Sequence, residues 1–267
     1  MDQSVDIQII ESKENKYIKL ATLLHQKKGR EQEGLFLLEG KTLVQEALKK
    51  NLDIKFTFVS NSKTLDEIKL PYDIQSFEVS EDLMSKISTT DTPPPIVAVA
   101  QLPSFEDSLS GIEQKNIFLY LENISDPGNL GSIIRTAFAA GVKTIYISPG
   151  SVDVFNPKAL RSSMGTAFYG AIRYIGLEEL INKLKQHSTS LEILGTCPRA
   201  EINYNDIQFS PFKNILLLVG NESHGLSDSA KKLCTQLVQI PLANDVESLN
   251  ILAATSVILF ELQKNNK

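Results

Sequence analysis

The pattern of apolar and polar positions divides the chain into two halves, each of which alternates helical and extended segments. In the first half, apolar residues at helical spacing predict helices over "NKYIKLATLLHQ" and "KTLVQEALKK". Strands are predicted at "GLFLLEG", "IKFTFVS", "IQSFEVS" and "IVAVAQL". The three prolines of "TTDTPPP" exclude a helix just before the last of these strands. The first half is therefore expected to form a small α/β unit.

The second half repeats a strand–helix rhythm more regularly. Strands are predicted at "IFLYLE", "TIYIS", "GAIRYI", "LEILGT", "ILLLVG" and "LVQIP". Helices are predicted over residues 130–140, 156–163, 177–187, 228–233 and 249–262. Mostly apolar strands that alternate with helices indicate a mostly parallel sheet with helices on both faces. The expected fold is α/β, with domains at 1–104 and 116–267 and a polar linker at 105–115.

The composition is that of a soluble globular protein with ample material for a core. The chain has 267 residues, of which 42% are hydrophobic and 22% charged. No apolar run approaches the ~18 residues of a membrane span, and "MDQSVDIQII" lacks the layout of a signal peptide. Cys197 and Cys234 have no partners at metal-ligand spacing, so no metal is expected and a reducing cytoplasm fits.

The net charge of −5 argues weakly against nucleic acid, but the charge is unevenly distributed. Residues 13–50 carry nine Lys or Arg against five Glu. Solvated helices account for this local excess, and an RNA-facing loop at "HQKKGR" (His25–Arg30) accounts for it equally well.

Three loops of unusual composition follow strands of the second half, and ligands of parallel sheets gather at the carboxyl ends of strands. The first loop is "ENISDPGNLGSIIR", in which Asp126 and Pro127 break the strand. A helix is expected from near Leu130. The free N–H groups and positive dipole end at such a junction favour anions.

Arg135 is an unusual residue in this helix of small and apolar side chains. One stripe is expected to be buried and consists of Leu130, Ile134, Ala137, Phe138 and Gly141. Arg135 lies about 100° away from Ile134. The neighbours in its own row are small, namely Gly131, Ser132 and Ala139. This face leaves room for a ligand, although a capped helix with an exposed arginine explains the pattern equally.

The second loop, "LLLVGNESHGLS", also follows a buried strand. Gly220 and Gly225 permit close approach and unusual backbone dihedral angles. The loop lacks the Lys and Ser/Thr of a P-loop and the GxGxxG of a dinucleotide site, which disfavours an NAD-dependent oxidoreductase. Glu222 is expected to hold the loop through backbone amides, and His224 is either a base or a solvated loop histidine.

The third loop lies within "QIPLANDVESLNILAATSVILFEL". Pro241 ends the strand, and Ser248, Asp245 or Glu247 can each cap the helix that follows. Ser248 and Asn250 therefore stand at a helix start beside the loop.

In this order the loops resemble the three motifs of the SpoU/TrmH family of the SPOUT superfamily: "ENISDPGNLGSIIRTAFAAGV", "LLLVGNESHGLS" and "IPLANDVESLNILAATSVILFE". The segment "LRSSMGTAF" (160–168) is similar to the family's Arg-x-Ser-x-Gly segment. Residues 10–102 resemble its ribosomal-protein-like substrate-binding domain through "KYIKLATLLHQKKGREQEGLFLLEGKTLVQEAL" and "TPPPIVAVAQLP". Asn244 and Ser223 stand where glycine is common in the family. Because asparagine tolerates left-handed dihedral angles, the turn at Asn244 is expected to survive.

This resemblance implies a deep trefoil knot and an S-adenosylmethionine-dependent RNA ribose 2′-O-methyltransferase. It also implies a homodimer in the cytoplasm, without membrane partners; the apolar last helix would serve a dimer or an intrachain core equally. Ribosomal RNA, with a guanosine or uridine of 23S-type RNA as target, is the expected substrate. A tRNA methyltransferase and a non-catalytic RNA-binding relative are the alternatives.

The resemblance also assigns site residues. Catalytic or orienting roles fall to Asn129, Arg135, Glu222, Ser248 and Asn250. The cofactor is expected to contact Thr196, Leu218, Gly220, Asn221, Ile240, Leu242 and Leu249. RNA is expected to contact Lys16, Lys27, Lys28, Arg30 and Arg161. Because a guanidinium hardly deprotonates, Arg135 is expected to clamp a phosphate and to stabilise a developing alkoxide.

Overall fold

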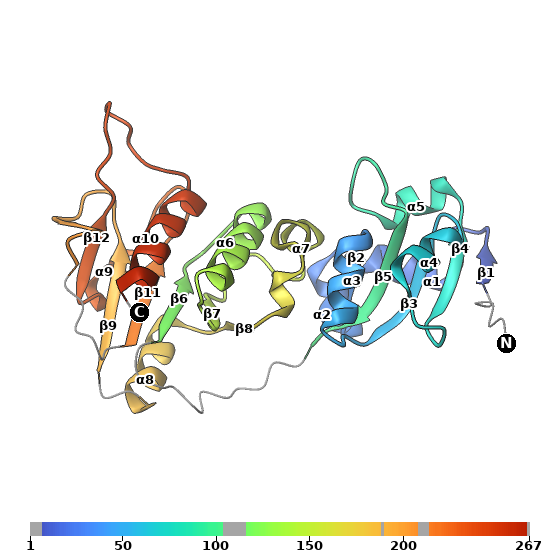
Figure 1. Ribbon diagram of the computed structural model, residues 1–267, viewed down its shortest axis with the longest axis horizontal. Helices are drawn as coiled ribbons and strands as arrows, with labels where there is room; N and C mark the ends of the chain where they lie inside the picture. Colours follow the sequence, from blue (N-terminus) through green and yellow to red (C-terminus); the bar gives the residue numbers. More distant parts are fainter. Residues whose placement is uncertain (1–6, 104–115, 188–189, 208–213, 266–267) are drawn as a thin grey trace. The chain divides into compact units, whose positions relative to one another are not determined.

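The computed structural model describes residues 7–103, 116–187, 190–207 and 214–265 (Figure 1). The chain forms two compact units. Unit 1 comprises Met1–Ser104 and Asp153–Phe168, and unit 2 comprises Phe105–Val152 and Tyr169–Lys267. The chain therefore passes from one unit to the other three times. The predicted linker 105–115 lies outside the described residues. Within the described ranges, no helix is long and apolar enough to cross a membrane.

Unit 1 is built on a five-stranded sheet with the strand order β1-β4-β3-β5-β2 (Figure 1). Its strands are β1 (Ile7–Ile10), β2 (Leu35–Glu39), β3 (Ile54–Val59), β4 (Gln75–Val79) and β5 (Ile96–Gln101). β1 and β3 run parallel to β4, whereas β5 runs antiparallel to β3 and β2. The four predicted strands are confirmed. The edge strand β1 has only four residues, too few to show a period in the sequence.

The helices of unit 1 are α1 (Lys16–Leu23), α2 (Lys27–Glu33), α3 (Lys41–Lys49), α4 (Lys63–Ile68), α5 (Glu81–Ile87) and α7 (Pro157–Ser163), with the 3₁₀ turn η1 (Thr166–Phe168). The predictions of α1, α3 and α7 are confirmed. Of the two alternatives for "HQKKGR", the structure excludes a loop from Lys27 onward and agrees with a helix there, because α2 begins at Lys27. The apolar pattern does not predict α2, because its seven residues "KKGREQE" contain no apolar stripe.

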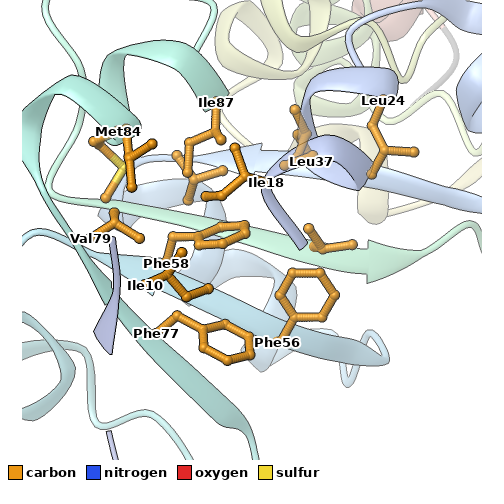
Figure 2. Close-up of a cluster of buried hydrophobic side chains, with 14 residues drawn as sticks. Ile10, Ile18, Leu24, Leu37, Phe56, Phe58, Phe77, Val79, Met84 and Ile87 are labelled. Atoms are coloured by element: carbon orange, nitrogen blue, oxygen red, sulfur yellow. The ribbon is translucent and has the colours of Figure 1, made fainter. Parts of the chain in front are cut away.

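Apolar side chains from the sheet, α1 and α5 fill the core of unit 1 (Figure 2). Phe58 lies at the centre, with ring centroids 5.5 Å from Phe56 and 5.9 Å from Phe77. Ile18 of α1 and Ile87 of α5 are fully buried against these rings. Each buried aromatic ring removes a large apolar area from water, so this cluster stabilises unit 1.

The segment Asp153–Phe168 packs as part of unit 1, although the sequence places it in the second domain. The ring of Phe36 on β2 lies 4.9 Å from that of Phe155 and 6.1 Å from that of Phe168. Gly165 has a φ of +80°, and a Cβ added there would come within 2.7 Å of the Glu46 Cβ on α3. Glycine at 165 therefore permits both the turn and its close packing.

Unit 2 contains a seven-stranded sheet with the order β10-β12-β9-β11-β6-β7-β8 (Figure 1). Its strands are β6 (Ile117–Leu121), β7 (Thr144–Ile147), β8 (Ala171–Tyr174), β9 (Leu191–Thr196), β10 (Ile202–Asn203), β11 (Asn214–Val219) and β12 (Gln236–Gln239). Every neighbouring pair is parallel. The predicted parallel sheet is confirmed, and the two-residue strand β10 extends it.

Helices cover both faces of this sheet, as predicted. They are α6 (Pro127–Ala139), α8 (Leu177–His187), α9 (Asp228–Leu233) and α10 (Ile251–Asn265). Phe118 and Tyr120 of β6 pack in one core with α8 and α9. Alternate residues such as Leu119 point to the opposite face, where α6 and α10 pack against each other (Figure 1).

Candidate functional site

The loop after β6 ends in a capped helix start. The Asp126 side chain accepts a hydrogen bond from the Asn129 amide at 2.8 Å. Pro127 occupies the first helical position, where a missing N–H leaves no partner unsatisfied. α6 therefore begins three residues before the predicted start at Leu130.

The loop after β11 closes on itself between Asn221 and Gly225. The Asn221 amide donates to the Gly225 carbonyl at 3.0 Å, and the Gly225 amide donates back to the Asn221 carbonyl at 2.9 Å. A Cβ at Gly220 would lie 2.1 Å from the carbonyl carbon of Gly225, which has a φ of +66°. Both predicted glycine roles, close approach and unusual dihedral angle, are confirmed.

Glu222 ties these two loops together. Its Oε1 accepts from the Asp126 amide and from Asn129 Nδ2, both at 3.2 Å. Its Oε2 accepts from the Ser125 amide at 3.3 Å and the Ser125 hydroxyl at 3.0 Å. Asn221 Nδ2 donates to the same oxygen at 3.3 Å. The expected role of Glu222 in holding backbone amides is confirmed, but most of those amides belong to the other loop.

These contacts favour the ionised carboxylate. Burial raises the pKa of Glu222, but hydrogen bonds from its own amide, the Asp126 amide and the Asn129 side chain outweigh burial. The Ser125 amide acts in the same direction, so the pKa lies below its ordinary value. Glu222 is therefore an ionised hydrogen-bond acceptor that orients both loops.

A second carboxylate joins the same two segments. Glu122 accepts from the Ser227 amide and from the Ser227 hydroxyl, both at 2.8 Å. Ser227 in turn caps α9 by accepting from the Ala230 amide at 3.1 Å. Neither Glu122 nor Ser125 is among the site residues predicted from the sequence. The density of polar residues in "ENISDPGN" is the signal that could have found both.

Asn221 fixes the inner side of the second loop. Its Nδ2 donates to the Asn123 carbonyl at 2.7 Å. Its Oδ1 accepts from the Ser223 amide at 2.9 Å and from the His224 amide at 3.2 Å. The ring nitrogen Nδ1 of His224 also lies 3.2 Å from this oxygen. Both ends of the Asn221 amide are thereby assigned by their partners.

A cavity of about 250 Å³ lies beside this network. Its walls come from the end of β9, the loop after β11, the end of β12 and the start of α10. Six predicted cofactor residues line it: Thr196, Gly220, Asn221, Ile240, Leu242 and Leu249. Leu218 does not, because its side chain is fully buried in the core with α8 and α9. Cys197 and His224 line the cavity without having been predicted to do so.

The third loop contributes Ser248 to the cavity, but Ser248 is not the helix cap. The Asn250 side chain accepts from the Leu252 amide at 2.8 Å, and α10 begins at Ile251. Asn250 caps α10 because its side chain reaches the second helical amide. Asn244 has a φ of +58°, so the expected left-handed turn without glycine is confirmed.

Arg135 lies exposed on α6 and outside the lining of the cavity. In the described part of the chain its guanidinium has no hydrogen-bond or ion-pair partner. The predicted stripe is only partly right, since the buried residues of α6 are Leu130, Gly131, Ile133, Ile134 and Ala137. Gly131 therefore belongs to the buried face, and Gly141 is exposed. Ser132 and Ala139 remain as the small neighbours of Arg135.

The predicted RNA contacts in unit 1 fall into two groups. Lys16, Lys27 and Lys28 are exposed. Arg30 is only 2% exposed and is paired with Asp153, so its assignment to RNA is corrected. Arg161 is half-buried, and its guanidinium pairs with the buried Glu39 at 2.8 Å and donates to the Thr89 hydroxyl, so it is engaged within unit 1. Position in the basic run does not distinguish Arg30 from the exposed Lys27 and Lys28 beside it.

Residues 116–260 match the model of the SpoU rRNA Methylase family, and residues 15–98 match the MRM3-like substrate binding domain. The chain is 34% identical over 258 residues to the 23S rRNA (guanosine(2553)-2′-O)-methyltransferase RlmP of Bacillus subtilis (strain 168). This match covers 95% of the chain and 98% of the relative. The motifs and both matched regions agree with the resemblance that the sequence suggested.

Two further comparisons extend the agreement. The 23S rRNA (uridine(2479)-2′-O)-methyltransferase of Streptomyces viridochromogenes is 28% identical over 263 residues, covering 94% of the chain and 90% of the relative. An AdoMet-bound rRNA methyltransferase from Sinorhizobium meliloti has a TM-score of 0.84 at 28% identity, covering 97% of this chain and 98% of that one. The chain therefore belongs to the SpoU/TrmH family of S-adenosylmethionine-dependent RNA 2′-O-methyltransferases, and unit 2 has the parallel-sheet α/β fold of its SPOUT members.

Proposed function

We propose that this protein methylates the 2′-hydroxyl of one ribose in large-subunit ribosomal RNA. The observation that carries this proposal is the Glu222 network, which fixes the start of α6 to the loop that walls the cavity. The network thereby holds a small-molecule cavity and the exposed, unpaired Arg135 in fixed relative positions. This arrangement suits the transfer of a small group to a substrate that carries phosphates. Two relatives are named as 23S rRNA methyltransferases, and these names support ribosomal RNA as the substrate.

The lining of the cavity suits S-adenosylmethionine in its chemistry. The cavity volume of about 250 Å³ lies just below the ~300–1,000 Å³ typical of ligand sites. Val219, Ile240 and Ile258 give it apolar walls for a purine ring. Gly220 lets the backbone of Gly225 and Leu226 pack directly against the end of β11, because a Cβ there would lie 2.1–2.3 Å from their atoms. When bound, S-adenosylmethionine supplies an electrophilic methyl group.

The chain's own residues supply positioning and charge. Arg135 binds the phosphate next to the target ribose and stabilises negative charge that develops on the 2′-oxygen. Asn129 and Glu222 hold the start of α6, and hence Arg135, at a fixed place relative to the cavity. Ser248 bonds the ribose or the cofactor from the third loop. The side-chain oxygen Oδ1 of Asn250 caps α10, which leaves its Nδ2 to bond the ribose or the cofactor.

Unit 1 binds the RNA outside the target nucleotide. The match to a substrate-binding domain supports this role, and the exposed Lys16, Lys27 and Lys28 are its proposed phosphate contacts. Arg30 and Arg161 take no part in it, since both are paired inside unit 1.

The protein acts as a homodimer in the cytoplasm in this proposal. Val257 and Phe260 of α10 are 38% and 48% exposed, although they belong to the most apolar helix of unit 2. An exposed apolar face on a helix that also walls the cavity suits a partner subunit there.

Transfer of labelled methyl from S-adenosylmethionine to separated rRNA and tRNA, both from cells that lack the protein, tests the proposal. We expect label in a 2′-O-methylated nucleoside of the rRNA fraction, and a much lower initial rate of labelling with the Arg135→Ala variant. Label in tRNA alone would show that the substrate is tRNA and not rRNA. Label in neither fraction, from protein that binds the cofactor, would contradict the proposed RNA substrates.

A further inference from the structure

Methyl transfer to a hydroxyl releases one proton, and the residues assigned above provide no group to take it. Arg135 is a permanent cation and cannot accept a proton. We propose that His224 is the general base of the reaction and that its Nε2 removes the 2′-hydroxyl proton. The inference deepens the proposed function and rests on it.

The ionisable side chains that line the cavity leave His224 as the suitable acceptor. Within the described lining these side chains are Cys197, Glu222 and His224. Both Glu222 oxygens already accept hydrogen bonds from donors of the two loops. Cysteine thiols are themselves protonated near neutrality. Histidine is the side chain that exchanges a proton in the neutral range, which is what general base catalysis requires.

The contacts of Asn221 fix the tautomer of the His224 ring. Nδ2 of Asn221 donates to the Asn123 carbonyl and to Glu222, which are both acceptors. The other end of the amide is therefore the oxygen, and it accepts the amides of Ser223 and His224. An amide oxygen can only accept, so His224 Nδ1, at 3.2 Å, must carry the proton.

A neutral ring with its proton on Nδ1 has its lone pair on Nε2. In the described part of the chain, Nε2 of His224 has no hydrogen-bond partner. Asn221 thus does for His224 what an orienting residue does for a catalytic histidine: it sets the tautomer and limits ring rotation. The ring is exposed at the cavity, where an RNA ribose can reach it.

The proposed step is balanced. The 2′-oxygen forms a bond to the methyl carbon while the carbon–sulfur bond breaks and its electron pair stays on sulfur. The hydroxyl proton passes to Nε2, and the ring becomes a cation that later releases the proton to solvent. Asn221 Oδ1 accepts the hydrogen bond from Nδ1–H throughout the step, so it stabilises the imidazolium cation that forms.

The tautomer can be tested without catalysis. The chain has three histidines, so ¹⁵N-histidine labelling of the full chain gives three rings, assigned by single His→Gln variants. Long-range ¹H–¹⁵N correlations should show His224 as the Nδ1–H tautomer. His25 is the internal reference, because its Nε2 lies 2.9 Å from the Ile87 carbonyl and must be the protonated nitrogen there. A neutral His224 that carries its proton on Nε2 would overturn the proposal, whichever RNA is the substrate.

Kinetics test the role itself. Single-turnover methylation by the wild type should fall at acidic pH, in the range where histidine takes up a proton. His224→Gln should lower the neutral rate by about 10²-fold and remove this inflection, with cofactor affinity held within about threefold. His187→Gln, an exposed histidine of α8, is the matched control and should keep the wild-type profile. A His224→Gln rate within threefold of wild type across this pH range would refute the role.

Discussion

Arg30 and Asp153, 123 residues apart in the chain, form a buried ion pair inside unit 1. Arg30 Nε donates to Asp153 Oδ2 at 2.8 Å, and the side chains are 3% and 14% exposed. Nη1 of Arg30 also donates to the carbonyls of Leu24 and His25 at 2.8 and 3.0 Å. One guanidinium therefore fastens the segment after β7 to the turn between α1 and α2.

Arg30→Met should strongly destabilise unit 1, because it leaves the Asp153 carboxylate buried without its cation. We expect a loss of about 3–5 kcal/mol in the free energy of unfolding, measured by denaturant titration of the full chain. Lys28→Met, an exposed neighbour on α2, should change it by less than ~0.5 kcal/mol. A loss below ~1 kcal/mol for Arg30→Met would show that the pair behaves like a surface ion pair.

Lys27 and Lys28 should affect RNA binding and not stability. The double variant Lys27→Gln/Lys28→Gln should weaken rRNA binding and reduce the slope of log K against log salt by about 1 per lysine. Lys55→Gln/Lys63→Gln removes the same charge from other exposed positions of unit 1 and is the control. Equal loss of slope in both variants would indicate general charge attraction without a localised contact.

Glu222 should give the folded protein a defined acid dependence. Its folded pKa lies below the ordinary value of 4.5, so its contribution to stability is complete above that value. The contribution is lost as the pH falls from 4.5 through the lowered pKa of the folded state. The difference in free energy of unfolding between wild type and Glu222→Gln should therefore be constant near neutrality and shrink in acid. A difference that grows as the pH falls would contradict the assigned direction.

Arg135→Ala should slow methyl transfer by roughly 10²–10³-fold, the usual effect of removing a group that stabilises developing negative charge. Cofactor affinity, measured by calorimetry, should not change, since Arg135 lies outside the cavity lining. Arg135→Lys keeps the charge but loses the bidentate fork, so it should recover only part of the rate. Full recovery by lysine would argue against a bidentate phosphate clamp.

Gly220→Ala should disrupt the closed loop after β11. Its Cβ would meet backbone atoms of Gly225 and Leu226 at 2.1–2.3 Å, which the chain can relieve only by moving the loop. We expect a loss of about 1–3 kcal/mol in the free energy of unfolding, together with weaker binding of S-adenosylmethionine. Gly176→Ala is the matched control, because a Cβ there has no described neighbour within 4 Å. Wild-type affinity in Gly220→Ala would contradict the role of this crossing.

The sequence predicts the fold of unit 2 well because its strands are strongly apolar and alternate regularly with helices. The bounds of α8 and α9 agree with the prediction at both ends, since each is set by local residues. β10 and α2 are too short or too polar to produce a periodic signal. The sequence predicts the start of α6 three residues late, because Asp126 and Pro127 are typical of a strand break as well as of a cap followed by a first helical residue.

The candidate site is predictable only in part. The three loops follow from the topology of a parallel sheet, and most of the residues named from them line the cavity. The partners of Glu222 and the tautomer of His224 depend on distances across the fold, which no local pattern encodes. The burial of Arg30 depends on Asp153 in the same way. The sequence of a basic run is the same whether its side chains face solvent or a buried carboxylate.

The interrupted course of unit 1 also has a consequence for its biosynthesis. A ribosome that has released residue 104 has supplied all five strands of the sheet, but not the segment that covers Phe36 and neutralises Arg30 and Glu39. Those groups stay uncovered until residue 168 has left the exit tunnel, by which time β6, α6 and β7 of unit 2 have been made. Unit 1 therefore cannot finish folding before synthesis of unit 2 has begun, so the two units are not made strictly one after the other.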